Sequence, residues 1–230
     1  MSTHEGMTSI VRKFLMALSG FFLLIFLLQH CAINFLSVIS PDMFNSVSHF
    51  MGTNPLIQFA MQPILAFGVF FHIIMGVILN KMNDAARPIK YAMNKPAENS
   101  SWMSRNMVIT GIMILLFLGL HFYDFWIPEL NVKYIQGDMS GLLDPTFAES
   151  GLRYHEELVH KFHNPIRTSI YILAFVFLSL HLLHGFQSAF QSAGFRHSKY
   201  TPMIKKLGNL YGIIVPAGFV FIAIYHFING

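Results

Sequence analysis

The chain has 230 residues, of which 54% are hydrophobic and only 11% are charged. A soluble domain of this size carries about 25% charged residues, so this chain lacks the polar surface of a water-exposed globule, and a membrane protein is predicted. The net charge of +4 does not indicate nucleic-acid binding, because the basic residues form short clusters between apolar runs. The single cysteine, Cys31, excludes an intramolecular disulfide, a Cys-rich zinc site and the C-x-x-C-H attachment site of a c-type haem.

Five apolar runs reach the roughly 20 residues that a membrane-spanning helix needs. They cover residues 14–38, 57–80, 106–127, 166–190 and 207–229. Asn80 and Lys81 are expected to close the second run and Pro128 the third, whereas Pro165 is expected to open the fourth. The sequence therefore predicts an all-α bundle of five transmembrane helices that forms a single membrane domain over residues 1–230.

The connecting segments predict how the bundle is oriented in the lipid bilayer. If the N-terminus is cytoplasmic, the outer side holds only four of the fifteen Lys and Arg residues, namely Lys133, Arg153, Lys161 and Arg167. Because Lys and Arg are enriched in cytoplasmic loops, this count places the N-terminus in the cytoplasm and the C-terminus outside.

An outer loop contains His155 and His160 within the sequence His-Glu-Glu-Leu-Val-His. The segment resembles the H-E-x-x-H zinc motif only superficially, because its histidines are five residues apart and point to different helix faces. We expect a solvated interfacial helix here.

Each of the first four predicted spans contains a histidine: His30, His72, His121 and His181. An ionisable side chain inside a span indicates a functional site. At 1.5 Å per residue, His30 and His121 lie roughly 22–24 Å along helices that enter from the cytoplasm, and His72 and His181 lie about 22 Å along helices that enter from outside. The four histidines therefore sort into an outer pair and an inner pair. Two imidazoles at one depth suit a six-coordinate haem iron.

Glycines flank the inner pair at helical spacing. Gly68 and Gly76 lie four residues before and after His72, and Gly185 lies four residues after His181. Residues at i and i±4 share a helix face, so these missing side chains could leave room for a porphyrin. The same spacing also packs helices against each other, and the pattern does not separate the two interpretations.

The fourth span contains a second histidine, His184, on a similar helix face to His181. His181 is better centred in the span, and Gly185 lies one turn after it. We therefore predict His181 as the ligand and keep His184 as the alternative.

With these residues in place, the sequence resembles the single-subunit, di-haem cytochrome b anchor of succinate:quinone oxidoreductases, the succinate dehydrogenase/fumarate reductase cytochrome b family. The resemblance covers nearly the whole chain. The closest stretches are Leu28-Gln29-His30 through Asn34, Phe44-Asn45-Ser46, Phe50-Met51 with Pro55, Phe71-His72 with Gly76-Val77, and Phe177-Leu178-Ser179-Leu180-His181 with Gly185.

The resemblance implies two b haems, with His72 and His181 as axial ligands of the inner one and His30 and His121 as those of the outer one. It implies two partners on the basic cytoplasmic face, a flavoprotein that oxidises succinate and an iron–sulfur subunit, so that the chain acts as a subunit of an enzyme of the tricarboxylic acid cycle and the respiratory chain. The electron acceptor would be a membrane quinone, menaquinone being usual for di-haem members. The expected location is the bacterial inner membrane.

The sequence departs from fumarate-reducing relatives at two places. Some of those relatives place a glutamate just before the ligand histidine of the fourth helix, where this chain has Leu178, Ser179 and Leu180. The acidic residue proposed at their distal quinone site also lacks a counterpart, and the nearest position holds Asn45. For a quinone near the outer haem, the polar candidates are Asn45, His49 and Asp124, although a solvated loop or helix end also accounts for each.

Three other classes remain as alternatives. A cytochrome b anchor of hydrogenase or formate dehydrogenase would stack histidines on a single helix, and no such stack occurs here. A non-haem di-iron enzyme would show several clustered histidine boxes, and only His181 and His184 come near that pattern. A haem-free membrane scaffold would show no haem spectrum.

Overall fold

The computed structural model describes residues 8–85, 105–144, 146 and 151–230. Its helical elements, in chain order, are α1 (Ser9–Ile39), α2 (Pro41–Thr53), the π-helix η1 (Ile57–Met61), α3 (Gln62–Ala85), α6 (Met107–His121), the π-helix η2 (Phe122–Trp126), α7 (Ile127–Leu130), the π-helix η3 (Asn131–Ile135), α8 (Tyr154–Phe162), α9 (Pro165–Ser192) and α10 (Thr201–Asn229).

Five helical segments among the described residues are long and apolar enough to cross a membrane. They cover Ser9–Ile39, Ile57–Asn83, Met107–Ile135, Pro165–Ser192 and Thr201–Asn229. Each corresponds to one of the five runs predicted from the sequence and is longer than it, although the third span begins one residue after the predicted run. The prediction of an all-α, multi-pass membrane bundle is confirmed.

Local sequence signals explain several of the helix ends. Ser40 ends α1 and caps α2, because its side chain accepts a hydrogen bond from the backbone N–H of Met43 and Pro41 stands in the first turn of α2. Pro165 opens α9 as predicted, and the Asn164 side chain accepts bonds from the first backbone N–H groups of that helix. Polar caps of this kind satisfy N–H groups that have no partner inside the helix.

Two predicted span ends are wrong. Pro128 does not end the third span, which continues through α7 and η3 to Ile135. Pro128 stands at the start of α7, directly after the π-helix η2. The backbone changes there from the i→i+5 hydrogen bonds of a π-helix to the i→i+4 bonds of an α-helix, so the N–H that proline lacks is missing at this change. Asn80 and Lys81 do not close the second span either, because α3 continues to Ala85; polar residues end an apolar run without ending a helix.

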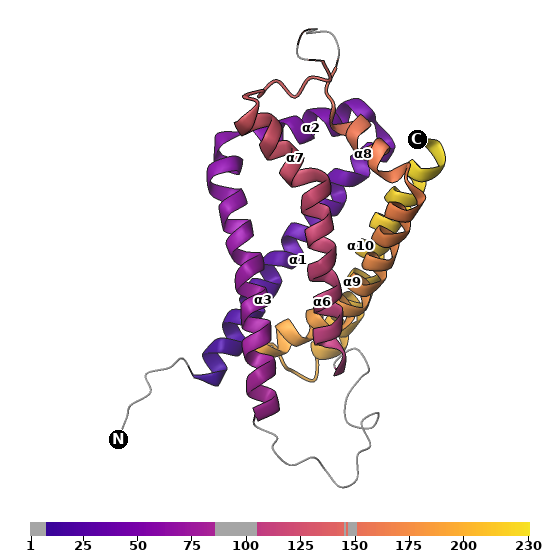
Figure 1. Cartoon of the computed structure of the whole chain (residues 1–230). Helices are drawn as coiled ribbons and strands as arrows, with labels where there is room; N and C mark the ends of the chain where they lie inside the picture. The colour runs from indigo at the N-terminus through magenta and orange to yellow at the C-terminus, as the bar shows by residue number, and fades with distance from the viewer. Residues whose placement is uncertain (1–7, 86–104, 145, 147–150) are drawn as a thin grey trace.

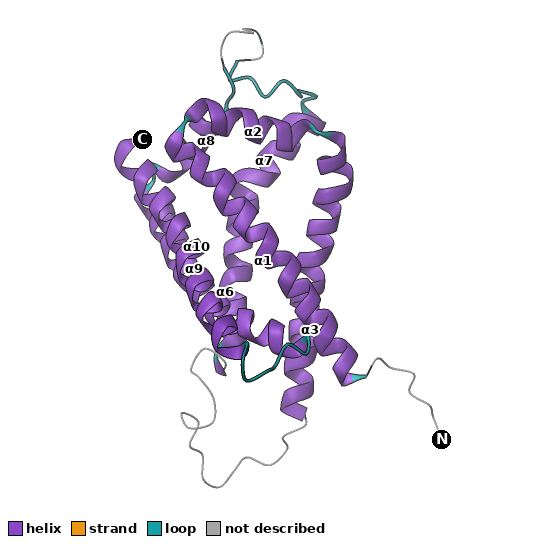
Figure 2. Ribbon diagram, turned by 180° about the vertical axis from the view of Figure 1, so that it is seen from behind, coloured by secondary structure: helices purple, strands orange, loops and turns teal. Residues whose placement is uncertain are grey.

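The two described chain ends lie at opposite ends of the bundle, as an odd number of spans requires (Figure 1). The end with the C-terminus, here called the outer end, is covered by α2, α7 and α8. Seen from behind, α1 runs obliquely across the bundle from α3 towards α8 and α10 (Figure 2), and it packs against α3, α9 and α10. In addition, α6 packs against α9. The helices that carry His30, His72, His121 and His181 therefore surround one interior.

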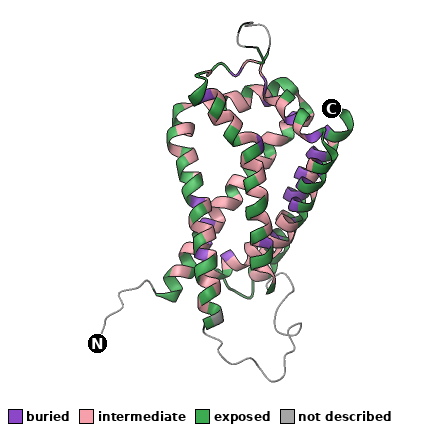
Figure 3. Cartoon of the chain, in the orientation of Figure 1, coloured by how far each residue is buried: buried purple, intermediate pink, exposed green. Residues whose placement is uncertain are grey.

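Burial is concentrated on one side of the bundle, along α9, α10 and the outer end (Figure 3). The largest cluster of buried apolar side chains comprises Phe44, Leu158, Phe162, Tyr171, Phe175, Val215, Phe219, Ile222 and Ala223. By contrast, large apolar side chains of η1 and α3 such as Phe59, Phe67 and Phe70 are exposed. In a bilayer such side chains face lipid tails, so their exposure fits a membrane-embedded bundle.

Candidate functional site

The inner histidine pair joins α3 to α9. The ring centroids of His72 and His181 are 6.4 Å apart. Each ring also reaches a hydroxyl group on a neighbouring helix: His72 Nδ1 lies 3.0 Å from Ser19 Oγ on α1, and His181 Nδ1 lies 3.2 Å from Thr110 Oγ1 on α6. Four helices therefore meet at the inner pair.

The two hydroxyl groups determine which ring nitrogens carry the protons. Ser19 Oγ donates to the carbonyl of Met16 at 2.8 Å, and Thr110 Oγ1 donates to the carbonyl of Met107 at 2.9 Å. A hydroxyl has one hydrogen, so both oxygens accept a bond from the Nδ1–H of the facing histidine. The Nε2 atoms of His72 and His181 are then unprotonated. A metal-binding histidine shows this arrangement, in which one nitrogen donates to a protein group and the other binds the metal.

Glycines lie beside the same rings. A Cβ atom at Gly20 would be 3.9 Å from Cε1 of His72, and one at Gly111 would be 3.8 Å from Cε1 of His181. Both helices therefore approach the rings of the inner pair closely through backbone at these two glycines. Neither glycine lies at helical spacing from the histidine that it approaches, because each is on a different helix.

The glycines that the sequence analysis proposed for haem packing have different surroundings. A Cβ at Gly68 would meet the ring of Phe22 at 2.7 Å, so this glycine lets α1 approach α3 closely. A Cβ at Gly76 would lie 3.7 Å from Cε of Met16, and one at Gly185 would lie 3.3 Å from Cε of Met107 and 4.0 Å from Cδ2 of His181. These three glycines pack helix against helix at the level of the inner pair.

The outer pair joins α1 to α6 in an aromatic setting. The ring centroids of His30 and His121 are 5.8 Å apart. The ring of Phe26 stacks on that of His30 with a centroid separation of 5.4 Å, and the ring centroids of Phe125 and His121 are also 5.4 Å apart. Asn34 Nδ2 lies 3.3 Å from Nδ1 of His30, whereas Nδ1 of His121 is buried and has no hydrogen-bond partner.

The same short pattern recurs in α1 and α6. Ser19-Gly20 precedes His30, and Thr110-Gly111 precedes His121, with eleven residues from hydroxyl to histidine in both helices. Each helix thus gives a hydroxyl and a glycine to the inner pair and a histidine to the outer pair. At 1.5 Å per residue the two levels are about 16 Å apart. This repeat is visible in the sequence, but its meaning depends on the contacts with α3 and α9.

The ring separations of both pairs are close to the value for two imidazoles that hold one metal ion. Two rings that each bind through a nitrogen at about 2 Å have centroids roughly 6 Å apart, close to the two separations found. Within the described ranges, no group of three or more His, Cys, Asp or Glu side chains could hold a metal ion. A zinc or di-iron centre built from side chains alone needs more ligands than one pair offers. The histidine pairs are better suited to a cofactor that supplies the remaining ligands itself, as a haem does.

Of the two histidines in the fourth span, His181 faces His72 and Thr110. His184, the alternative ligand, lies three residues further along α9 and is half-buried. The geometry of the inner pair involves His181.

The first two quinone candidates, Asn45 and His49, bind protein groups. The Asn45 amide donates to the carbonyl of Leu152 at 2.9 Å and accepts from the backbone N–H of His155 at 2.8 Å, so it joins α2 to the start of α8. His49 Nδ1 lies 3.3 Å from the hydroxyl of Tyr154. Burial, together with the negative charge of Glu129, raises the pKa of Tyr154 to about 12, so this hydroxyl stays protonated.

The third candidate, Asp124, is buried one turn beyond His121. Its Oδ2 accepts a hydrogen bond from the hydroxyl of Tyr171 at 2.8 Å, and Nη2 of Arg167 lies 3.4 Å from its Oδ1. A buried carboxylate needs such partners. Asp124 therefore ties the third span to α9 beside the outer pair.

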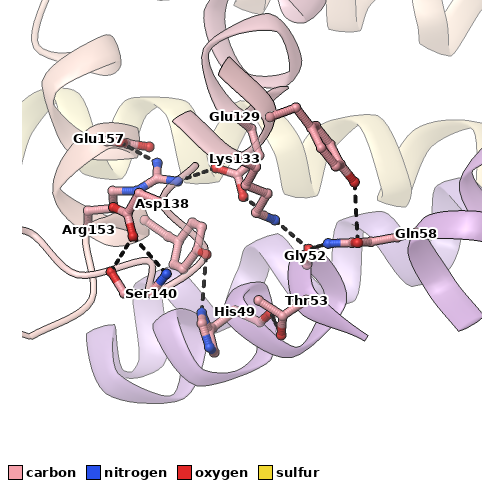
Figure 4. Close-up of polar contacts among 12 residues, drawn as sticks. His49, Gly52, Thr53, Gln58, Glu129, Lys133, Asp138, Ser140, Arg153 and Glu157 are labelled. Atoms are coloured by element: carbon pink, nitrogen blue, oxygen red, sulfur yellow. Dashed lines mark hydrogen bonds and ion pairs between the residues drawn. The ribbon is translucent and has the colours of Figure 1, made fainter. Parts of the chain in front are cut away.

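An outer ion-pair cluster holds α2, α7, η3 and α8 together (Figure 4). Glu129 binds Nζ of Lys133 and Nη2 of Arg153, each at 2.5 Å. Arg153 also binds Glu157 at 2.6 Å, and Nζ of Lys133 donates to the carbonyl of Gly52. Both cations are buried and share the Glu129 carboxylate, and Glu157 supplies the second negative charge. The cluster fixes the outer end of the span that carries His121.

Comparisons of the chain with models of protein families, with curated proteins and with solved structures give no match. The functional interpretation therefore depends on the geometry of the histidine pairs and on the family resemblance of the sequence.

Proposed function

We propose that the chain is the di-haem cytochrome b membrane anchor of a succinate:quinone oxidoreductase. The observation that supports this proposal best is the arrangement of four histidines from four spans as two facing pairs, about 16 Å apart along the bundle. Two haems at these two levels would provide a route for electrons through the apolar bundle. A single haem at one level would not reach both ends.

In this function the protein holds two cofactors and keeps water away from them. Haem supplies one-electron chemistry, and two histidine ligands leave the iron no open position for oxygen, which favours electron transfer. Ser19 and Thr110 orient His72 and His181, and the aromatic residues around His30 and His121 enclose the outer pair.

The end of the bundle opposite the C-terminus is the proposed docking face for the iron–sulfur and flavoprotein subunits. The described basic residues there include Arg196, Lys199, Lys205 and Lys206, at the end of α9 and the start of α10. The basic residues Arg87, Lys90 and Lys95, predicted for the same face, lie outside the described residues. Chemical cross-linking of the native complex is expected to join Lys199 to the iron–sulfur subunit. Links from Lys133 or Lys161 instead would contradict this orientation.

The proposed acceptor is a membrane quinone, with menaquinone the member that the family resemblance favours, reduced near the outer haem. Each electron that moves to the outer side then crosses the membrane potential, which is worth about 2.3 kcal/mol per 100 mV. Succinate oxidation in vesicles is therefore expected to generate a potential, reported by a voltage-sensitive dye. An electroneutral reaction that ignores an uncoupler would contradict an outer quinone site.

Purification with the native partners tests the whole proposal. We expect two b haems per chain by pyridine-haemochrome assay, two separate steps in a redox-poised visible spectrum, and reduction of both haems by succinate. A chain without haem would refute the function, and haems reduced by hydrogen or formate but not by succinate would assign the chain to another oxidoreductase.

A further inference from the structure

A hollow of roughly 630 Å³ opens at the outer end of the bundle, between the end of α1, α8 and the end of α10. Figure 1 shows α8 and the C-terminal end of α10 next to each other at this end. Four histidines border the hollow: His155, His160, His163 and His226. Neither the histidine pairs nor the outer ion-pair cluster uses any of them.

Two of these histidines are bound to the same residue, Ser37. Ser37 Oγ donates its only hydrogen to the carbonyl of Asn34 at 2.6 Å, so it accepts a bond from Nε2–H of His226 at 2.8 Å. The carbonyl of Ser37 accepts a bond from Nε2–H of His155 at 3.2 Å. Both neutral imidazoles are thereby fixed as the tautomer with an unprotonated Nδ1.

The two imidazoles are close enough to act as one unit. Their ring centroids are 5.4 Å apart, with an angle of 76° between the ring planes. Two positive charges at this separation repel each other, so protonation of one ring disfavours protonation of the other. Two neighbouring acceptors that do not both carry a proton can take up and release a single proton; such a pair is called a proton-exchange site here.

The surroundings of the pair include exposed side chains and one acidic side chain. The other titratable side chains at the hollow are Glu156, His160 and His163 from α8 and the turn after it, and Tyr225 from α10; the parts of α1 and α2 that border it, residues 37–39 and Pro41, carry no charge. Glu156, His160 and His163 are exposed, so protons reach the hollow from the outer aqueous phase. His226 itself is only 2% exposed.

The pair is also close to the outer histidines, along two helices. Ser37 follows His30 by seven residues on α1. His226 follows Phe219 by seven residues on α10, and the ring of Phe219 lies 5.7 Å from that of His30. Seven residues correspond to about 10 Å of helix. Two unit charges at this distance in a protein of low dielectric constant interact appreciably.

We propose that His155 and His226 form a proton-exchange site that takes up one proton from the outer aqueous phase when the outer haem is reduced. The electron comes from the succinate-oxidising partners through the inner haem. The proton comes from water, and one N–H bond forms at Nδ1 of one of the two histidines. This inference rests on the proposed function. In this inference the two histidines do not touch the outer haem. They act on it through the positive charge that they gain when one of them binds a proton.

The test is a redox titration of the purified complex over about pH 5 to 8, where imidazoles titrate. The midpoint potential of the outer haem is expected to fall as the pH rises, because the proton stabilises the reduced state. The limit is a tenfold change in its redox equilibrium constant per pH unit, or about 59 mV. The inner haem is expected to show a smaller dependence.

Substitution identifies the group responsible. We expect the double variant His155→Gln and His226→Gln to lose most of the pH dependence of the outer haem and to keep both haems. The matched control, His160→Gln with His163→Gln, removes two histidines from the same hollow and is expected to keep the dependence. If the buried substitution prevents folding, His155→Gln alone is measured and is expected to reduce the dependence.

A second measurement does not depend on turnover. Nitrogen-15 spectra of the histidines are expected to show more protonated imidazole at His155 and His226 in the reduced complex than in the oxidised one, at the same pH. A two-haem double variant with unchanged pH dependence, or histidine spectra that ignore the redox state, would overturn this inference. A chain that binds no haem would instead refute the proposed function.

Discussion

The inner and outer histidine pairs have similar ring separations, but their surroundings differ. Ser19 and Thr110, from two further helices, fix the inner rings through hydrogen bonds. The outer rings are packed among aromatic side chains, Asn34 lies within hydrogen-bond distance of Nδ1 of His30, and Nδ1 of His121 has no hydrogen-bond partner. A hydrogen bond to the second nitrogen orients a histidine ligand and makes it more basic. The comparison indicates that hydroxyl groups from two further helices orient both inner rings, whereas only one of the outer rings has such a polar partner.

The largest expected effect is the loss of one haem from one level. His72→Ala is expected to lower the haem content from two to one by removing the inner haem, and His30→Ala to lower it equally by removing the outer one. Pyridine-haemochrome assay gives the content, and the redox-poised spectrum tells which haem remains. If either variant loses both haems, or neither, the two pairs are not separate sites.

Substitution of the two histidines of the fourth span tests which of them binds the inner haem. His181→Ala is expected to abolish the inner haem because His181 faces His72. His184→Ala, the matched control one turn away, is expected to keep two haems. The opposite result in the same assay would transfer the ligand role to His184.

Breaking the outer ion-pair cluster is expected to affect the outer site more than the inner one. Glu129→Gln leaves Lys133 and Arg153 buried without their shared carboxylate, and removing one partner of a buried ion pair costs about 3–5 kcal/mol. Since the same helical span carries His121, the outer haem is expected to be released at lower temperature, as followed by its absorbance on heating. Glu156→Gln, at an exposed position of α8, serves as the control. Equal loss from both levels would show that the cluster does not act locally.

The smallest expected effect concerns the hydroxyl groups of the inner site. Ser19→Ala and Thr110→Ala remove the acceptors of His72 and His181, and loss of such partners typically weakens metal binding by 10–100-fold. The inner haem is expected to dissociate more readily, measured by transfer to an apo-haem protein, while the outer haem is unchanged. Ser169→Ala removes an exposed hydroxyl of α9 that bonds only to its own helix and is expected to change neither rate. If the inner haem dissociates at an unchanged rate in both variants, Ser19 and Thr110 do not accept hydrogen bonds from Nδ1–H of the two histidines as assigned.

Features that depend on local composition were predictable. The five spans follow from the length and apolarity of each run, and the two histidine levels follow from a fixed helical rise. The helix at His155 was also predicted and is found as α8. The end of the third span was not, because Pro128 reads as a helix stop unless the π-helix before it is known.

Contacts between helices needed the tertiary structure. Gly68 has the spacing of a cofactor-facing glycine, but the ring of Phe22 faces it, and only the packing of α1 on α3 shows this. Ser19 and Thr110 look like ordinary hydroxyl groups of apolar helices until α3 and α9 bring the histidine rings to them. Ser37, His155 and His226 come together from three helices far apart in the chain.

The sequence by itself determined that this protein crosses the membrane five times and carries a histidine at matched depths in each of four spans. Periodicity and hydropathy act within one helix, so one helix is enough to reveal them. The tertiary structure decided which nitrogen of His72 and of His181 is free, and which residues surround each pair. These properties depend on how neighbouring helices are rotated and placed, and that arrangement results from contacts between side chains distant in the sequence.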